Sequence, residues 1–360
     1  MSNRTICDRD TPDPWMIAAN NRFYFTFTCG NRIELWASQH LEDFRHAQTQ
    51  KSTIWAPAKD SPWSCDVWAP EIHLLNGTWY VYFCAAQPGK GNASHRTLVL
   101  RSSNPDPMDP AAWHFVGPIK GLPDHWHIDA TVFQLGHQLY CCYSGWPLGD
   151  HSDTQQDLFV IRLASPEVAI AETLTCISRA SLAWERPEGG RRGVNEGPTW
   201  LSLPGFQGIV YSANGSWTCD YQLGIVALVG ADPCQESSWQ KRHTPLLVCD
   251  KEKGPFGPGH ASFVHSPYND GRVYCIYHGT ERRDEGWANR KARVLMMGPE
   301  AFHPHAPPLC CATGWPVQQS GMPHAHHGNP GTGNQNNPLI PQLPFGLGKY
   351  QDKLMQKFKF

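Results

Sequence analysis

Apolar and polar positions alternate along most of this chain in short runs, a pattern typical of β-strands and unlike the 3.6-residue period of helices. Five stretches share one layout, in which an anchor residue opens a strand-like run that passes through a turn into a second strand. The anchors are Asp13, Ala69, Asp129, Glu196 and His260, and the turns are Asn20–Asn21, Asn76–Gly77, Gly136–His137, Pro204–Gly205 and Asn269–Gly271. This pattern predicts five β-hairpins.

The five anchors lie 56 to 67 positions apart. Repeats of this size, built from short strands without helical periodicity, are typical of the four-stranded blades of a propeller. We therefore predict an all-β fold, a five-bladed β-propeller formed by residues 1–317. Residues 318–360 are rich in Gln, Gly, Asn, His and Pro, and this low-complexity composition predicts a disordered C-terminal tail.

Four of the five anchors are ionisable. The innermost strands of a propeller line one central channel, so Asp13, Asp129, Glu196 and His260 are predicted to converge there. A Gly-Pro pair follows Glu196, keeps the backbone out of a helix and puts the carboxylate at the mouth of a strand. Buried charges need partners or a function, so this convergence indicates a functional site. The alternative is that Glu196 is an ordinary residue of a surface turn.

Composition narrows the range of partners. The formal net charge of −2 and the pI near 6.8 give no electrostatic footprint for nucleic acid or an anionic membrane. No run of about 18 apolar residues is present, so no membrane-spanning helix is expected. The 15 tryptophans suit both β-sheet cores and platforms on which sugar rings stack. Most of these tryptophans are expected in the core, and the oligomeric state is left open.

Signals for the cellular compartment conflict. Residues 1–7 contain no apolar stretch of the signal-peptide type, which favours an intracellular protein unless the N-terminus is incomplete. Asn-x-Ser/Thr sequons at Asn3, Asn76, Asn92 and Asn214 would matter only in a secreted chain. The 13 cysteines show no zinc-type spacing, and several fall within predicted strands, so reduced thiols are expected.

Sequence motifs surround the five anchors. They are Cys7-Asp8-Arg9-Asp10-Thr11-Pro12-Asp13-Pro14-Trp15, Trp68-Ala69-Pro70-Glu71-Ile72-His73, Ile128-Asp129-Ala130-Thr131-Val132-Phe133, Asn195-Glu196-Gly197-Pro198 and Gly257-Pro258-Gly259-His260. In this order and at this spacing they resemble glycoside hydrolase family 43, most closely its exo-α-1,5-L-arabinofuranosidase branch. The resemblance covers about residues 8–317.

The resemblance implies a five-bladed propeller and an inverting mechanism. In it Asp13 matches the general base, Glu196 the general acid, and Asp129 the carboxylate that orients the acid and raises its pKa. His260 matches the family's axial histidine, which in many members supports a central calcium or other ion through water. Arg293 resembles the pocket arginine of the last blade. The implied substrate is arabinan or an arabino-oligosaccharide of the plant cell wall, with no organic cofactor.

Four tryptophans near the anchors are candidates to stack on the sugar: Trp15, Trp68, Trp146 and Trp217. Each can instead serve as structural packing.

Three competing functions are each judged by the sequence motif or catalytic carboxylates that they would require. A β-xylosidase or an endo-arabinanase of the same family would use the same three carboxylates, so the sequence leaves both open. A fructan or sucrose hydrolase would carry an Asn-Asp-Pro-Asn-Gly motif, which is absent. A non-catalytic carbohydrate-binding propeller would have lost at least one of Asp13, Asp129 and Glu196, and all three are present.

Overall fold

The structure is a computed structural model and describes residues 4–46, 49–266 and 270–312. The fold is all-β, and the helices of the described residues are short 3₁₀ segments. These are η1 (Leu41–Arg45), η2 (Asn92–Ser94), η3 (Pro110–Ala112), η4 (Ala171–Thr173), η5 (Ala183–Glu185), η6 (Pro187–Gly189), η7 (Glu236–Ser238) and η8 (Pro299–Phe302). In this part of the chain no helix has the length and apolarity to cross a bilayer. The prediction for residues 318–360 lies outside the described residues.

Three of the sheets have four antiparallel strands each. The first contains β2 (Trp15–Ala19), β3 (Arg22–Thr26), β4 (Ile33–Ser38) and β5 (Gln50–Trp55). The second contains β6 (Cys65–Leu75), β7 (Thr78–Ala86), β8 (Arg96–Ser102) and β9 (His114–Pro118). The third contains β20 (Phe256–His265), β21 (Val273–Thr280), β22 (Lys291–Met297) and the N-terminal β1 (Arg4–Thr5).

The remaining strands form one 11-stranded sheet. Its first group is β10 (His127–Leu135), β11 (Gln138–Gly145), β12 (Gln155–Ser165), β13 (Val168–Ala169) and β14 (Thr175–Ser178). Its second group is β15 (Gly193–Leu203), β16 (Phe206–Ala213), β17 (Gln222–Leu228), β18 (Trp239–Lys241), β19 (Leu247–Val248) and β23 (Leu309–Cys310). The groups are joined by a short parallel pairing in which Gln155 and Gln156 of β12 face Gly193 and Val194 of β15. This junction differs from the separate blades that the repeat predicts.

All five predicted hairpins are present as antiparallel pairs: β2–β3, β6–β7, β10–β11, β15–β16 and β20–β21. Their turns explain why the sequence folds back where it does. Asn20 and Asn21 both have positive φ, as do Asn76 and Gly77, the geometry that matches the twist of a two-residue hairpin. Asn and Gly tolerate this left-handed conformation, so the turn positions are fixed locally.

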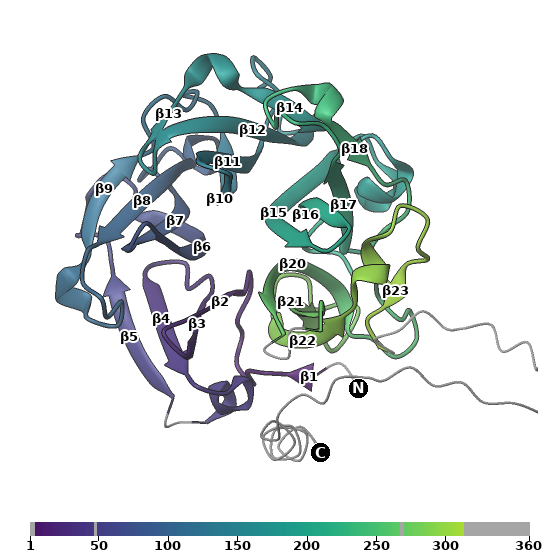
Figure 1. Cartoon of the computed structure of the whole chain (residues 1–360), viewed down its shortest axis with the longest axis horizontal. Coiled ribbons are helices and arrows are strands. Elements are labelled where there is room, and N and C mark those ends of the chain that lie inside the picture. The colour runs from purple at the N-terminus through teal and green to yellow at the C-terminus, as the bar shows by residue number, and fades with distance from the viewer. Residues whose placement is uncertain (1–3, 47–48, 267–269, 313–360) are drawn as a thin grey trace, which may run out of the picture. The chain divides into compact units, whose positions relative to one another are not determined.

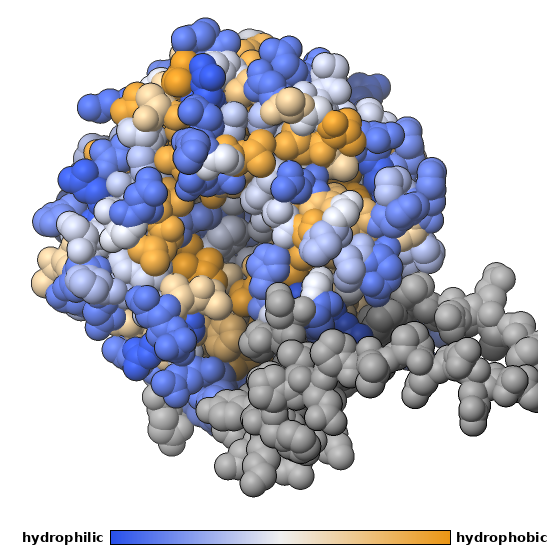
Figure 2. Space-filling model, viewed as in Figure 1, coloured by the Kyte–Doolittle hydropathy of each residue, from blue (hydrophilic) through white to orange (hydrophobic). Residues whose placement is uncertain are grey.

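The sheets are arranged around a common centre with β2, β6, β10, β15 and β20 innermost (Figure 1). Neighbouring sheets enclose clusters of buried apolar side chains, and one such cluster joins the first sheet to the last. That cluster packs Met16 and Phe25 of the first sheet with Ile276 and Ala292 of the last. The face seen in Figure 2 is hollowed at its centre, between the sheets.

Candidate active site

A cavity of about 830 Å³ collects most of the predicted site residues. Its lining includes Asp13, Asp129, Glu196 and His260, together with Trp68 and Trp217. It also includes residues that the sequence analysis did not single out: Thr28, Trp126, Gln156, Arg192, Trp287 and Arg290. The repeat therefore brings four ionisable anchors from four hairpins into one space.

Four of the five anchors share a left-handed backbone conformation. Asp13, Ala69, Asp129 and His260 all have positive φ, between 46° and 55°, which is rare for residues other than glycine. The last three of these lie at a register shift in their hairpin, where an extra residue breaks the ladder. Such bulges bend a strand and redirect its side chains, and they often occur next to active sites.

The fourth hairpin is offset by one position from the predicted alignment. Its register shift follows Glu196, and its positive φ falls on Gly197. By geometry Gly197 is thus the equivalent of Asp129 and His260, while Glu196 corresponds to Ile128 in the third hairpin. Glu196 reaches the cavity from the position before the bulge, where Ile128 also lines it.

Asp13 lies in a cationic environment. Its Oδ1 lies 3.3 Å from His260 Nδ1 and 3.4 Å from a guanidinium nitrogen of Arg290. Its Oδ2 accepts a hydrogen bond of 2.7 Å from the Thr28 hydroxyl. Burial alone would raise the pKa of Asp13, but the charges of Arg290 and His260 outweigh it and hold that pKa well below its usual range. These contacts therefore favour the ionised form of Asp13.

His260 carries the balancing positive charge. Burial disfavours its protonated form, but the carboxylates of Asp13 and Asp129 outweigh burial and raise its pKa to about 9. Its backbone N–H donates to the Ser212 hydroxyl at 2.7 Å, which holds the β20 backbone that carries the imidazole. The imidazolium therefore contributes charge and orientation to Asp13.

Asp129 and Glu196 behave in the opposite way to Asp13. Burial raises the pKa of Asp129, and the negative charges of Glu196 and Asp13 raise it further. Burial and the Asp13 charge likewise raise the pKa of Glu196. One Asp129 oxygen accepts the Gly197 N–H at 3.0 Å, and one Glu196 oxygen accepts the Gln156 side-chain amide at 3.3 Å. The surroundings of this pair thus favour a retained proton, whereas those of Asp13 favour its ionised form.

Three residues predicted to bind the substrate lie outside the cavity lining: Trp15, Trp146 and, described below, Arg293. Trp15 belongs to the apolar cluster between the first two sheets, and its Nε1 donates to the Ile72 carbonyl. Trp146 lies behind the cavity wall, because its ring stacks on Trp126 at 4.8 Å and Trp126 is the lining residue. These two predictions differ from the structure because both side chains are taken up by packing.

The predicted pocket arginine is also displaced. Arg293 is buried in β22, where its Nε donates to the Gly279 carbonyl, and it does not line the cavity. Arg290, three residues earlier, contacts Asp13 instead. Arg290 and Trp287 lie in the loop before β22, where no strand periodicity marks a position. The only sequence signal for them was their proximity to the predicted arginine motif.

His260 is the residue predicted to support a central ion through water. Among the described residues, no group of three or more His, Cys, Asp or Glu side chains is placed to hold a metal ion. His260 Nδ1 lies 3.3 Å from Asp13 Oδ1, so this nitrogen is directed at the carboxylate. A direct calcium ligand set of such side chains is thus absent among the described residues, and an ion supported by His260 through water stays a prediction.

Comparison with known proteins places this geometry in a family. The chain is 32% identical over 266 residues to the extracellular exo-α-(1→5)-L-arabinofuranosidase of Streptomyces avermitilis, covering 73% of this chain and 53% of that protein. It is 30% identical over 269 residues to the enzyme of the same name from Streptomyces chartreusis, covering 74% of this chain and 78% of that protein. The chain thus spans about half the length of the first of these relatives.

The structural comparison agrees. The crystal structure of an α-L-arabinofuranosidase from Lactobacillus brevis superimposes with a TM-score of 0.73 at 27% identity, covering 82% of this chain and 92% of that one. The model of glycosyl hydrolases family 43 matches residues 2–298. The chain belongs to glycosyl hydrolase family 43.

Proposed function

We propose that this chain is an inverting exo-α-L-arabinofuranosidase that releases L-arabinofuranose from arabinan or arabino-oligosaccharides of the plant cell wall. The proposal is carried by the convergence of Asp13, Asp129 and Glu196 in one cavity, where the surroundings lower the pKa of Asp13 and raise that of Glu196. The names of the two Streptomyces relatives and of the Lactobacillus structure support arabinofuranose as the sugar.

The proposed chemistry follows from these protonation states. Inverting hydrolysis needs a carboxylate that activates water and a carboxylic acid that protonates the departing oxygen. We assign the first role to Asp13 and the second to Glu196. Asp129 is assigned to orient the acid through Gly197. We also assign it to raise the pKa of Glu196, because the Glu196 charge raises the pKa of Asp129 and the same repulsion acts in return. Arg290 and His260 keep Asp13 ionised, which is the state that accepts a proton from water.

Sugar binding is assigned to the aromatic and polar wall of the cavity. Trp68, Trp126, Trp217 and Trp287 line it, and Trp287 is 60% exposed, which leaves a ring face free for a sugar. Arg192 also lines the cavity, and its Nε is buried without a hydrogen-bond partner among the described residues. A sugar hydroxyl at this position would satisfy that donor.

We also propose that the five groups of strands are the blades of a five-bladed propeller. One strand of each group lies innermost, and apolar side chains pack between the first and last sheets. Both features support this architecture. In this arrangement the short β12–β15 pairing is a contact between neighbouring blades.

Substrate preference tests the assignment of sugar. We expect the purified chain to hydrolyse an aryl α-L-arabinofuranoside and arabino-oligosaccharides, with arabinose as the released product. Faster turnover of an aryl β-D-xyloside would favour a β-xylosidase. Release of oligosaccharides from polymeric arabinan would favour an endo-arabinanase. No hydrolysis of any of the three, with retained binding, would identify a non-catalytic carbohydrate-binding protein.

Product stereochemistry tests the mechanism independently. NMR of the sugar released in the first moments of the reaction is expected to show the inverted anomer, before mutarotation mixes the two forms. A product of retained configuration would reject the roles given to Asp13 and Glu196.

A further inference from the structure

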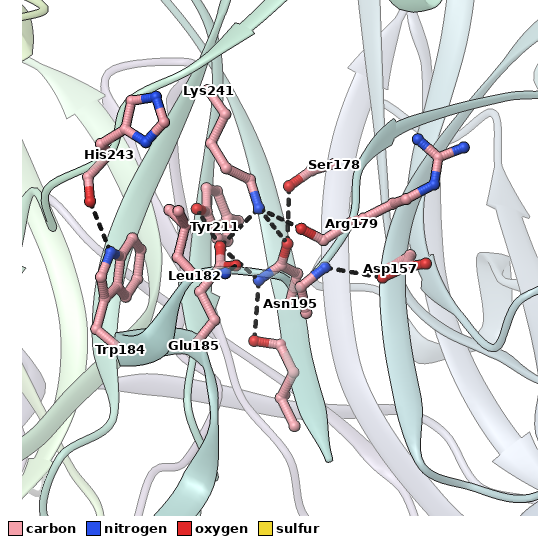
Figure 3. Close-up of polar contacts among 12 residues, drawn as sticks. Asp157, Ser178, Arg179, Leu182, Trp184, Glu185, Asn195, Tyr211, Lys241 and His243 are labelled. Atoms are coloured by element: carbon pink, nitrogen blue, oxygen red, sulfur yellow. Dashed lines mark hydrogen bonds and ion pairs between the residues drawn. The ribbon is translucent and has the colours of Figure 1, made fainter. Parts of the chain in front are cut away.

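A buried polar cluster lies immediately before Glu196, outside the cavity lining (Figure 3). We call it the Lys241 cluster, and it consists of Lys241, Glu185, Asn195, Tyr211 and Ser178. These residues come from β18, η5, β15, β16 and β14, so five separate segments meet at one point. Buried ionic groups cost free energy on folding and are often retained for a specific structural or functional role.

Lys241 is fully engaged within this cluster. An ammonium has three protons to donate. Lys241 Nζ donates to Glu185 Oε1 at 2.6 Å, to Asn195 Oδ1 at 3.1 Å and to the Arg179 carbonyl at 2.6 Å. The side chain is 17% exposed, and that of Glu185 is completely buried. One cation therefore neutralises the buried carboxylate and reaches the strand that carries Glu196.

Asn195 receives most of the remaining contacts. Its Nδ2 donates to Glu185 Oε1 at 3.0 Å, and its Oδ1 also accepts the Ser178 hydroxyl at 2.7 Å. Its backbone carbonyl accepts the Ser144 hydroxyl at 2.8 Å. Both serines lie in the preceding group of strands, whereas Asn195 lies in β15 of the next group. Asn195 is therefore held by contacts from both groups. Its side-chain amide and its backbone carbonyl are both fixed.

Glu196 depends on this anchorage because its own hairpin gives it little support on the other side. The β15–β16 ladder pairs Asn195 with Ala213 and Glu196 with Ser212, then breaks until Thr199. Between Glu196 and Thr199, where the ladder is interrupted, the Gly197 N–H donates to Asp129 at 3.0 Å. The backbone at Glu196 is thus held by its pairing with Ser212, by the Lys241 cluster on the side of Asn195 and by Asp129 on the side of Gly197.

We propose that Lys241 is a positioning residue that, through Glu185 and Asn195, fixes the backbone from which the Glu196 carboxyl reaches the leaving-group oxygen. This inference rests on the general-acid role proposed above for Glu196. Lys241 lies outside the cavity lining and acts through Asn195. Because proton transfer depends steeply on geometry, a displacement of about 1 Å can reduce a rate by about 10²-fold.

The test replaces Lys241 without leaving a buried charge. Lys241→Met alone would leave the buried Glu185 carboxylate without its cationic partner. The main variant therefore combines Lys241→Met with Glu185→Gln. The kcat/KM values are measured on a series of aryl α-L-arabinofuranosides whose phenols differ in acidity. We expect a loss of about 10-fold or more for the poorest leaving groups, little change for the best, and therefore a steeper dependence on leaving-group pKa.

The matched control is the neighbouring buried cation. Arg242 is 6% exposed and donates to the carbonyls of Thr244, Ala301 and His303, but has no bond to Asn195. Arg242→Met is expected to lower the thermal midpoint without changing the leaving-group dependence. If the double variant loses activity by the same factor on every substrate, the cluster is only structural and the proposal is overturned.

Two further measurements keep the result decisive. If the double variant does not fold, Tyr211→Phe, which removes one donor to Glu185 and no charge, is expected to steepen the dependence to a smaller degree. An unchanged slope in that variant would overturn the proposal. A crystal structure of the folded variant must also show the Glu196 carboxyl displaced from its wild-type position, and an unmoved carboxyl would reject the inference.

Glu196→Gln, run in parallel, separates this inference from the proposed function. A leaving-group dependence in Glu196→Gln without one in the double variant would reject the role of Lys241 and keep Glu196 as the acid. No dependence in Glu196→Gln would reject the general-acid role, and with it the proposal that Lys241 positions an acid.

Discussion

At the scale of single residues, the cavity separates two carboxyl groups by their surroundings. Asp13 contacts a guanidinium and an imidazolium, whereas Glu196 contacts a neutral amide. The first environment stabilises the charged form of a carboxyl group. At Glu196 burial, the largest influence on its pKa, outweighs the opposing interaction with Tyr221 and the charges of His260 and Arg192. Substitutions of the two residues should consequently have different signatures.

The first prediction concerns the leaving group. Glu196→Gln should lose about 10² to 10⁴-fold in kcat on arabino-oligosaccharides, whose departing oxygen needs a proton, and much less on an aryl glycoside with an acidic phenol. Asp13→Asn should be severely impaired on both, because water must be activated whatever leaves. Steady-state kinetics of both variants on both substrates checks this. Equal losses for Glu196→Gln on the two substrates would remove it from the acid role.

The second prediction concerns pH. Glu196 must be protonated to act, so its raised pKa sets a high-pH limb above the usual range of a carboxyl group. Replacing Asp129 with Asn removes a neighbouring negative charge, which makes Glu196 easier to ionise. The high-pH limb of kcat/KM in Asp129→Asn should therefore move to lower pH. A limb that stays in place or moves upward would show that Asp129 does not tune the acid.

At the scale of elements, β-bulges at the start of the inner strands present the functional side chains. In the fourth hairpin the left-handed position is Gly197, with φ of +52°. A Cβ built there would lie 3.1 Å from His260 Cγ and 3.2 Å from His260 Nδ1. The absence of a side chain at this point lets β15 approach the imidazolium that balances Asp13.

The third prediction follows from this contact. Gly197→Ala should lower kcat/KM, because the new methyl group pushes His260 and the Glu196 backbone apart in addition to the strain of about 1 to 2 kcal/mol of a left-handed alanine. Gly205→Ala is the matched control, since Gly205 also has positive φ but its Cβ would meet nothing within 4 Å. The control should lose stability and keep activity. Full activity in Gly197→Ala would contradict the close approach.

At the scale of the whole described unit, apolar packing joins sheets that share few hydrogen bonds. The cluster between first and last sheets contains Met16, Phe25 and Ile276, each fully buried. Nearby, the Ile6 N–H donates to the Ala292 carbonyl and extends the pairing of β1 with β22. The relative positions of Asp13 and His260, which come from these two sheets, depend on this interface.

The fourth prediction measures that interface. Ile276→Ala should reduce the free energy of unfolding by about 2 to 5 kcal/mol, because it leaves a cavity between two sheets. Val229→Ala, at a side chain that is 61% exposed, should change it by less than about 0.5 kcal/mol. Urea denaturation of both variants checks the difference. A small effect at Ile276 would show that the first and last sheets are not held together by this cluster.

Local sequence determined the parts of this protein that depend on short-range chemistry. Asn and Gly turns between aromatic and β-branched runs specify each hairpin, because turn geometry and strand periodicity are properties of a few adjacent residues. The recurrence of the pattern placed Asp13, Asp129 and His260 at equivalent positions. Both the all-β class and the convergence of the ionisable anchors follow from that repeat.

Tertiary structure alone decided which face each side chain presents and which loop residues join the site. Trp15, Trp146 and Arg293 lie near the motifs but are taken up by packing and backbone hydrogen bonds. Arg290 and Trp287 reach the cavity from a loop with no periodic signal. Lys241 meets Asn195 across 46 positions of the chain. Such contacts depend on how separate strands pack together, and no short stretch of sequence encodes that geometry.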